Sequence, residues 1–540
     1  MTARRFKFWG WGYEDERLSA DEERRLAEAY AARFGVDGDS FERLPVPDAG
    51  DIMLTKPRLD VPPALSAICT SAALDRLVHT YGKSFPDTVR AFEKDFANAP
   101  DVVAYPKNEN DVVAVLDWAA GNRAAVIPFG GGSSVVGGVE AAIGDGFEGA
   151  ISLDLKGLDQ VLEIDKTSRA ARIQAGILGP PLEAALKPEG LTLRHFPQSF
   201  EFSTLGGWIA TRSGGHYATL YTHIDDFVES VRMVTPIGVM ESRRLPGSGA
   251  GPSPDRLMIG SEGALGVITE AWMRLQDRPT HRASASVLFE DFFRGADAVR
   301  AIGQAGLYPA NVRLLDANEA KNTGAGDGSH ALMVLAFESA DHPVDAGMAR
   351  ALEITGDFGG VFEAEAAKKA SAHKAGAAGA WRDAFIRMPY YREYLAAIGV
   401  INFTFETATT WDRFRDFHDT VKAATLSAIE EATGTPGEVT CRFTHVYPDG
   451  PAPYFTVHAL GRHGEMMARW RHIKTKASDA IIDKGGTITH HHAVGRDHMP
   501  WYERQHPQAF TAALAAAKAR LDPAGILNPG VLVPASGGGS

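Results

Sequence analysis

A buried strand that runs straight into a series of glycines is the feature that most limits what this 540-residue chain can form. The stretch "AAVIPF" at residues 124–129 is uniformly apolar, and "GGGSS" at 130–134 follows it without a break. Glycine permits positive φ and lets backbone N–H groups approach an anion closely, and serine hydroxyls add further donors. The loop therefore suits a phosphate. A merely mobile turn is the plainer interpretation, and the loop alone leaves both open.

Two common phosphate-binding motifs are absent from this stretch. It contains no G-x-x-x-x-G-K-[ST] segment, its spacing is not G-x-G-x-x-G, and no helical pattern follows. Two more segments rich in small residues occur downstream, "QSFEFSTLGGWIATRS" at 198–213 and "GSEGALGVITEA" at 260–271. For the last of these an ordinary turn before a strand is the alternative. Together the three loops indicate one long ligand with a pyrophosphate and a flat ring.

The bulk properties exclude several classes of protein. A chain of 540 residues predicts more than one domain. The net charge of −13, without a basic block, argues against nucleic acid as the main partner. The chain has only two cysteines, Cys69 and Cys441, so we expect no disulfide framework and a reducing compartment such as the cytoplasm. We find no secretory signal and no run of roughly 20 apolar residues.

The three loops, "PFGGGSSVVGG", "EFSTLGGWIATRSGG" and "GSEGALGVITEA", resemble the flavin-binding segments of the vanillyl-alcohol-oxidase type FAD family, and the ending "LDPAGILNPG" is typical of FAD-linked oxidases. The stretches "FWGWG", "YGKSFPDTVRAF", "VRLLD", "FETATTWDRF" and "THHHAVG" are similar to one branch of that family, the alkyldihydroxyacetonephosphate synthases, which form the ether bond of ether lipids. The resemblance extends over most of the chain.

The resemblance implies an α+β fold, with a vanillyl-alcohol-oxidase type FAD-binding domain and an α+β cap domain built on a large antiparallel sheet. We expect an N-terminal helical region at 1–99, the FAD-binding domain at 100–279, the cap at 280–499, and a segment at 500–540 that returns to the FAD-binding domain. Within the cap, two rounds of strand, helix, strand, strand, helix predict a single sheet with helices on one face.

The resemblance also implies which residues hold the FAD. No histidine occurs between residues 123 and 194, so the covalent tether of many relatives is ruled out and the FAD should be noncovalent. The implied contacts are Pro128, Phe129, Gly130, Gly131, Gly132, Ser133 and Ser134 in the first segment; Gln198, Ser199, Phe200, Glu201, Phe202, Ser203, Thr204, Ala210, Thr211, Arg212 and Ser213 in the second; and Glu262, Gly263, Ala264, Leu265, Gly266, Val267 and Ile268 in the third.

Catalytic roles are implied for three residues. Tyr454 in "PAPYFTVHAL" matches an active-site tyrosine, a phenol of usual pKa about 10 that can transfer a proton if its site shifts that value. Taken alone, the strand pattern around Tyr454 favours packing in the core. Arg313 in "NVRLLD" matches an arginine on which activity depends, and an arginine in an apolar strand needs a buried acceptor. His491 is expected to face flavin and substrate as a proton carrier or polar anchor.

Substrate binding is implied for three more residues. Arg392 in "MPYYREYL" matches an arginine that holds a phosphate, for which a planar and permanently charged guanidinium is suited; a solvated helix charge is the alternative. His490 and His492 are assigned to the substrate site, packing or hydrogen-bonding behind His491. The implied reaction exchanges the acyl group of acyl-dihydroxyacetone phosphate for a long-chain fatty alcohol without net redox change of the flavin.

The histidine run at 490–492 also raises the question of a metal. If "TITHHH" is a strand, alternation places His490 and His492 on one face and His491 on the other, so the three cannot all meet on one ion. His445 or His458 would have to add ligands, with no zinc-like spacing. We therefore expect no metal.

Two rival functions remain open at this stage. The first is a flavin-dependent 2-hydroxyacid dehydrogenase of the same fold, since "HVYPDG" at 445–450 is close to the metal-binding pattern of those enzymes. The second is an inactive flavin- or lipid-binding protein. The implied partners are the lipid substrates, and peripheral membrane contact and a homodimer are left open.

Overall fold

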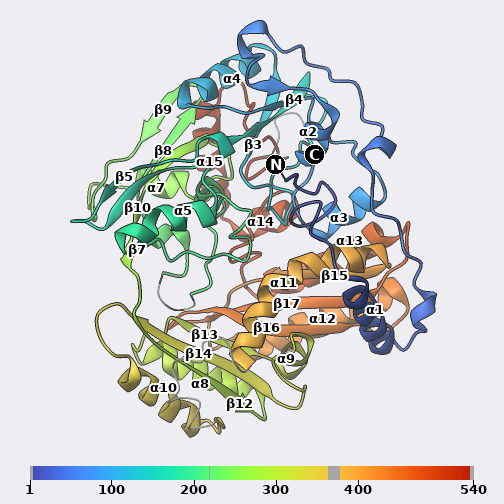
Figure 1. Cartoon of the computed structure of the whole chain (residues 1–540), viewed down its shortest axis with the longest axis vertical. Helices are drawn as coiled ribbons and strands as arrows, with labels where there is room; N and C mark the ends of the chain where they lie inside the picture. The colour runs from blue at the N-terminus through green and yellow to red at the C-terminus, as the bar shows by residue number, and fades with distance from the viewer. Residues whose placement is uncertain (1–3, 218, 220, 363–376, 535–540) are drawn as a thin grey trace.

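The computed structural model describes residues 4–217, 219, 221–362 and 377–534; the side chains of residues 377–386 are not among those described. Figure 1 shows two sheet-bearing parts, one formed mostly by the first half of the chain and the other by residues after about 280. Among the described residues, no helix is both long and apolar enough to cross a membrane.

The first part holds a short two-stranded sheet of β7 (Leu191–Thr192) and β11 (Gln276–Asp277) and two larger sheets. One has the strand order β1-β2-β4-β3, in which β4 pairs in parallel with both β2 and β3. The other is antiparallel, in the order β5-β6-β10-β8-β9. The strands are β1 (Cys69–Thr70), β2 (Val102–Ala104), β3 (Ala124–Phe129), β4 (Gly149–Asp154), β5 (Val161–Asp165), β6 (Ala170–Gln174), β8 (Val228–Thr235), β9 (Gly238–Glu241) and β10 (Val267–Arg274).

Helix α4 (Glu109–Gly121) connects β2 to β3 and covers the parallel sheet. It begins at Asn108, whose side chain accepts the N–H of Asp111, and acidic residues in its first turn complement the helix dipole. Its buried residues, Val112, Val115, Leu116 and Ala119, follow the spacing of one helix face and pack in the same core as the strands. This packing fixes the position of the C-terminal end of β3, where the glycine loop begins.

The second part is built on one antiparallel sheet, in the order β12-β14-β13-β16-β17-β15. Two strand–helix–strand–strand–helix units meet where β13 pairs with β16 at Leu315 and Arg442, so the predicted single sheet is confirmed. Its elements are β12 (His281–Phe289), α8 (Phe292–Gln304), β13 (Asn311–Leu315), β14 (Ala331–Ser339), α10 (Asp345–Asp357), β15 (Val400–Glu406), α12 (Phe414–Thr433), β16 (Glu438–Val446), β17 (Pro451–Leu460) and α13 (Met466–Asp483).

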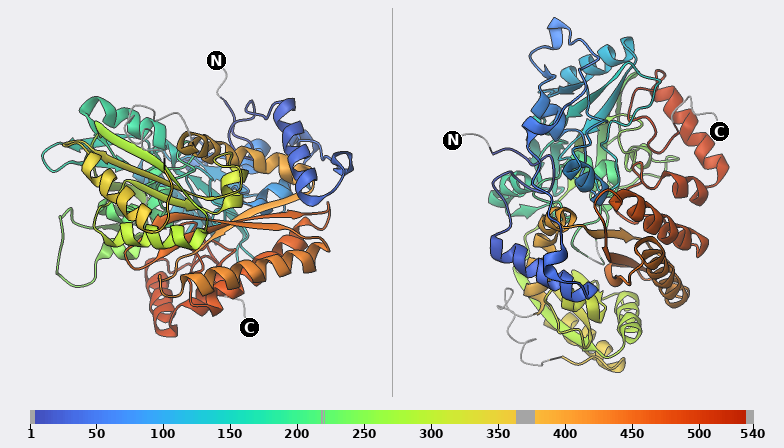
Figure 2. Two further views of the ribbon diagram at one scale, coloured as in Figure 1. Left: turned by 90° about the horizontal axis from the view of Figure 1, so that it is seen from below. Right: turned by 90° about the vertical axis from the view of Figure 1, so that its right-hand side faces the viewer.

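The four cap helices pack apolar side chains onto one face of this sheet in two core clusters, and α12 and α13 lie side by side along it (Figure 2). Since a strand alternates its side chains, every second residue points to the other face. That opposite face presents Arg313, Thr404, Arg442, Thr444 and Tyr454 to a cavity shared with the first part. The cap sheet is therefore apolar on one face and polar on the other.

Segments from both ends of the chain complete the first part. After helices α14 (Met499–Gln505) and α15 (Gln508–Leu521), the chain pairs with β3 through Leu527 and Val126. At the other end, residues 4–17 form a hook closed by a bridge between Phe6 and Tyr13, and Trp11 of this hook reaches the cavity. Helix α3 (Phe85–Phe92) and helix α11 (Ala377–Ala397), which carries Arg392, pack beside each other between the two parts.

Candidate active site

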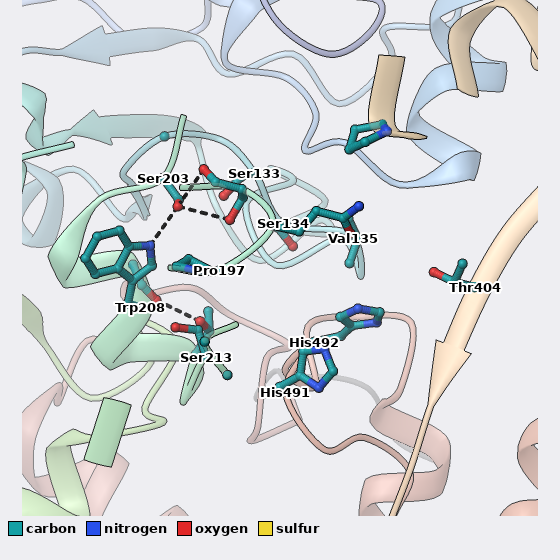
Figure 3. Close-up of a pocket in the computed structure, with 18 of the residues that line it drawn as sticks. Ser133, Ser134, Val135, Pro197, Ser203, Trp208, Ser213, Thr404, His491 and His492 are labelled. Carbon is teal, nitrogen blue, oxygen red and sulfur yellow. Dashed lines mark hydrogen bonds between the residues drawn. The ribbon is translucent and has the colours of Figure 1, made fainter. Parts of the chain in front are cut away.

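A cavity of about 200 Å³ lies between the two parts of the molecule. A second cavity of about 90 Å³ adjoins it and shares Gly130, Ser134 and Thr204 with it. Figure 3 shows Ser133, Ser134 and Val135 on one side of the larger cavity and His491 and His492 on another. The combined space is elongated and lined from both domains, which suits a long ligand with a substrate beside it.

The glycine loop makes closer contacts than any other residue type would allow. A Cβ on Gly131 would lie 1.6 Å from the carbonyl oxygen of Phe202, and one on Gly130 would lie 2.3 Å from Thr204 Oγ1. Within the described residues, the N–H groups of Gly131, Gly132 and Ser133 donate to no protein acceptor. A row of open backbone donors beside a cavity is an anion cradle, so the residues present fit the pyrophosphate of FAD.

Most of the residues assigned to FAD line one of the two cavities. The larger cavity contacts Gly130, Gly131, Gly132, Ser133, Ser134, Gln198, Ser199, Ser203, Thr204, Thr211 and Ser213; the smaller adds Pro128, Phe129, Ala210, Glu262, Gly263, Gly266 and Ile268. The three segments, which are far apart in sequence, are thus brought together around one continuous space.

The remaining assigned residues support the loops from outside these cavities. Ala264, Leu265 and Val267 are fully buried in apolar cores, and Phe200 stacks on Trp208. Phe202 packs edge-on against Trp11 and Tyr13 of the N-terminal hook. Glu201 is exposed, and Arg212 forms an ion pair with Asp225. These side chains shape the cavity wall without reaching the space itself.

On the cap sheet, three polar residues form one row across neighbouring strands. Tyr454 of β17 is the register partner of Arg442 in β16 and of Glu406 in β15. The Arg442 guanidinium lies 4.0 Å from the centre of the Tyr454 ring and is itself paired with the buried Glu319. The Tyr454 hydroxyl donates to Thr404 Oγ1 at 2.8 Å. The tyrosine is therefore held at its ring and at its hydroxyl while lining the cavity.

Arg313 has the buried acceptors that the sequence required. Its guanidinium donates to the carbonyl of His216 at 2.9 Å and to Asn311 Oδ1 at 3.3 Å, and it also lines the cavity. Burial and the neighbouring Arg442 cation lower the pKa of Arg313 to about 9. The side chain therefore remains cationic at neutral pH.

The histidine run does not form a strand, and that prediction is wrong: residues 487–495 form an irregular loop. The reason is the Glu406 carboxylate, which accepts the backbone N–H groups of His490, His491 and His492. Donors that face one carboxylate cannot also form a strand ladder. His491 and His492 line the cavity, whereas His490 lies behind them and bonds to Tyr447 at 2.7 Å.

Further histidines gather around this loop. His490 Nε2 lies 3.1 Å from His223 Nε2, and one nitrogen each of His445, His490 and His491 lie within 4.8 Å of one another. A β-bulge between Phe443 and His445 turns His445 toward the group. Three imidazoles at this spacing could hold a metal ion. His458 is not part of the group; it bonds to Tyr30 and Asn402.

The imidazoles of the loop are held in their neutral form. Burial lowers the pKa of His491, and it lowers the pKa of His445 and His490 well below the usual range. For His492 the pKa falls to about 3. At neutral pH these rings can therefore accept a proton or ligate a metal, but they carry no charge.

A small side chamber opens next to the cavity and shares Val135, Arg392, Thr404 and His492 with it. Arg392 donates to the carbonyl of Lys83 at 2.5 Å, and Lys474 of α13 donates to His498 Nε2 at 2.8 Å. Among the described residues, no carboxylate lies within 4.0 Å of either cation. Asp497 lines the same chamber and acts on Lys474 at longer range, but the partly buried Arg392 and the buried Lys474 outnumber it, so the chamber suits an anion.

Sequence reasoning missed Glu406, Lys474 and Arg442. Glu406 and Arg442 each lie in an apolar strand, where a charged residue signals a buried partner. Glu406 also belongs to the stretch "FETATTWDRF" that carried the resemblance. Lys474 sits among the other basic residues of "RWRHIKTK", and no pattern there distinguishes a buried lysine from exposed ones.

Two family models match this chain. Residues 100–242 match the FAD binding domain, and residues 278–532 match the C-terminal domain of FAD linked oxidases. Together they include the glycine loop, the cap sheet and the histidine run.

Individual relatives match over most of the chain. An alkyldihydroxyacetonephosphate synthase of Dictyostelium discoideum is 32% identical over 85% of this chain and 78% of its own length. One of Caenorhabditis elegans is 31% identical over 84% of this chain and 79% of its own length. A solved structure of an alkyldihydroxyacetonephosphate synthase superposes with a TM-score of 0.81 at 25% identity, covering 97% of this chain and 98% of that one.

Proposed function

The chain belongs to the alkyldihydroxyacetonephosphate synthase family, and from this premise we propose that it exchanges the acyl group of acyl-dihydroxyacetone phosphate for a long-chain fatty alcohol. The observation that carries the proposal is the cavity between the two domains, where the flavin segments face Arg392, Tyr454 and His491. The reaction needs FAD but leaves its redox state unchanged, so no electron acceptor takes part.

In this proposal the glycine loop holds the FAD pyrophosphate on its open N–H donors, and the small residues of the other two segments admit the flat ring. When bound, the flavin supplies an electrophilic ring beside the reacting carbon. Without a covalent tether, the cofactor is retained by these contacts alone.

Proton transfer falls to Tyr454 with His491 beside it. The substrate carbon that bears the acyl ester must lose a proton, and a positioned side chain can take it. Tyr454 is fixed by Arg442 and Thr404, and its ring centre lies 6.1 Å from that of His491. Because burial keeps His491 neutral, its imidazole can accept the proton in turn.

We place the substrate phosphate in the side chamber, between Arg392 and Lys474. A phosphate dianion would supply the close ion-pair partner that these two cations lack among the described residues. The chamber opens beside His492, so the phosphate would anchor one end of the substrate while its reacting carbon remains in the main cavity. The acyl and alkyl chains would then leave through the larger cavity.

A pair of assays on the purified protein tests this function. We expect a yellow protein that releases its flavin on treatment with acid or heat. It should form an ether lipid from acyl-dihydroxyacetone phosphate and a fatty alcohol with no electron acceptor present. Reduction of a dye by lactate or a similar hydroxyacid, without ether formation, would instead establish a dehydrogenase.

The histidine group provides a second way to separate these two functions. A dehydrogenase that uses a metal would lose activity with a chelator and regain it with the ion, through His445, His490 and His491. The proposed exchange needs no metal. We therefore expect elemental analysis to find fewer than about one metal ion per ten chains, and we expect full activity in the presence of a chelator.

Two finer points complete the proposal. The lipid substrates motivate the proposal that this cytoplasmic protein contacts membranes peripherally. Co-sedimentation with liposomes tests this, and a protein that does not pellet with them contradicts it.

A homodimer is the assembly we propose. Light scattering after gel filtration that gives the mass of one chain would refute it.

A further inference from the structure

Two buried glutamates from different domains hold the loop that carries the active-site histidines. Glu406, at the end of cap strand β15, accepts the N–H of His490 at 2.6 Å, of His491 at 3.2 Å and of His492 at 3.0 Å. The hydroxyl of Thr489 donates to the same carboxylate at 2.6 Å. Four consecutive residues are therefore fastened to one side chain.

On the other side of the loop, Glu262 of the third flavin segment accepts the N–H groups of Val494 and Gly495, both at 2.8 Å. Its own carbonyl is held by Asn528 at 2.7 Å. Only Ala493 separates the two sets of bonds, and its φ of +75° is a left-handed conformation that residues other than glycine seldom adopt. Such a backbone persists because both neighbours are fixed.

We propose that Glu406 and Glu262 are positioning residues that clamp the loop at 489–495 between cap and flavin domain, with Glu406 also orienting the imidazoles of His491 and His492 over the cavity. The proposal rests on the proposed function for its kinetic measurements only. Neither glutamate needs to touch the substrate; each acts through the backbone that it holds.

Glu406 also lies close to two of the histidine rings, so its role is not limited to anchoring the backbone. Its carboxylate oxygens lie 3.4 Å from His491 Nδ1 and 3.6 Å from His492 Nδ1. A proton on His491 Nδ1 facing this carboxylate leaves Nε2 as the free acceptor. The Thr489 hydroxyl and the loop N–H groups that donate to the carboxylate favour its ionised form.

The test uses three variants, Glu406→Gln, Glu406→Asp and Glu262→Gln. The matched control is Glu109→Gln, which removes a carboxylate of the flavin domain that is paired with Arg232, remote from the loop. Hydrogen exchange of the holoenzyme reports on the clamp without activity. In E406Q we expect the amides of His490–His492 to exchange faster than in wild type. In E262Q we expect the same of the amides of Val494 and Gly495. All other amides of both variants should exchange at wild-type rates. A glutamine offers one acceptor where the carboxylate offers two.

Steady-state kinetics then distinguish a positioning role of Glu406 from a purely structural one. In E406Q we expect kcat to fall about 100-fold, with KM for acyl-dihydroxyacetone phosphate changing by less than about threefold. E406D keeps the charge and both acceptor oxygens, so it should recover part of the lost kcat.

Exchange of the loop amides at wild-type rates in both E406Q and E262Q would overturn the proposal, as would an unchanged kcat in E406Q. If E406Q does not fold, E262Q and E406D carry the same measurements. If wild type itself forms no ether lipid, the proposed function fails, while the exchange data still decide on the clamp.

Discussion

At the scale of single residues, the side chamber is governed by the cost of burying charge. Lys474 is buried and Arg392 is partly buried, and carboxyl groups act on them only from beyond ion-pair distance. A buried ion without a close partner costs several kcal/mol. Burial lowers the pKa of Lys474 to about 8, so a bound anion would also favour its charged form. These two residues should therefore contribute more to substrate binding than to holding the fold.

Lys474→Met keeps the length of the side chain and removes its charge. We expect KM for acyl-dihydroxyacetone phosphate to rise roughly 10- to 100-fold, the value of one charge-assisted hydrogen bond, with FAD content unchanged. Steady-state kinetics measure this effect. The control is Lys476→Met on the exposed side of the same helix, which should leave KM as it is. Equal KM values in both variants would remove Lys474 from the phosphate site.

Tyr454→Phe removes only the hydroxyl and leaves the ring against Arg442. If this hydroxyl carries the proton, kcat should fall about 100- to 10,000-fold while flavin binding persists. The matched control is Tyr30→Phe, which removes a buried tyrosine hydroxyl that bonds to His458 of the same strand, away from the cavity. Activity of Y454F close to that of Y30F would transfer the proton step to another residue.

At the scale of elements, the glycine loop works because the second flavin segment is pressed against it. Gly131 and Phe202 are in direct backbone contact, and Phe202 is in turn covered by the N-terminal hook. The loop is therefore not an isolated turn. Its shape depends on two other segments of the chain.

Gly131→Ala tests this contact. The added methyl would lie 1.6 Å from the Phe202 carbonyl, so the two segments must move apart. We expect FAD to bind at least about tenfold more weakly, as judged from flavin fluorescence during titration of the apoprotein. Gly146→Ala is the control, because a Cβ there meets nothing within 4 Å. Unchanged FAD affinity in G131A would mean that the loop does not hold the cofactor.

The histidine loop shows where an element departs from its sequence pattern. The stretch "TITHHH" alternates as a strand does, but Glu406, 84 residues away from His490, supplies the hydrogen bonds that a neighbouring strand would have supplied. The β-bulge before His445 is a second departure, since it brings His445 toward the same loop. Neither contact can be read from local pattern, because both depend on partners distant in sequence.

At the scale of the whole molecule, the site exists only where the two domains meet, and many of its polar side chains are buried, neutral histidines. A histidine whose folded pKa lies below its unfolded value of 6.5 stabilises the fold fully above that pH and less as pH falls toward the folded value. The pKa of His195 and of His492 is lowered to about 3, and burial likewise lowers that of His445, His458, His490 and His498 well below the usual range.

We therefore expect the protein to lose stability between pH 7 and pH 5, by about 2 kcal/mol for each of His195 and His492 and in the same direction for the other four histidines. Buried carboxyls whose pKa is raised act in the opposite direction: Glu262 and Asp497, with a pKa of about 7, and also Asp87, Asp316 and Glu393. Among the described residues the histidines with a lowered pKa outnumber these carboxyls, so we expect the histidines to dominate. Calorimetry should give a lower Tm at pH 5 than at pH 7; an equal or higher value would contradict this balance.

The sequence by itself determined the cofactor, the family and the two-domain α+β plan, because these follow from local order: which small residues follow which buried strand, and in what succession. It also pointed to Tyr454, His491, Arg313 and Arg392, all of which line the cavity in the structure. Only the tertiary structure decided that Lys474 is buried beside Arg392 and that Glu406 and Glu262 hold the histidine loop. Burial and the convergence of distant charges are properties of packing, and no short window of sequence contains them.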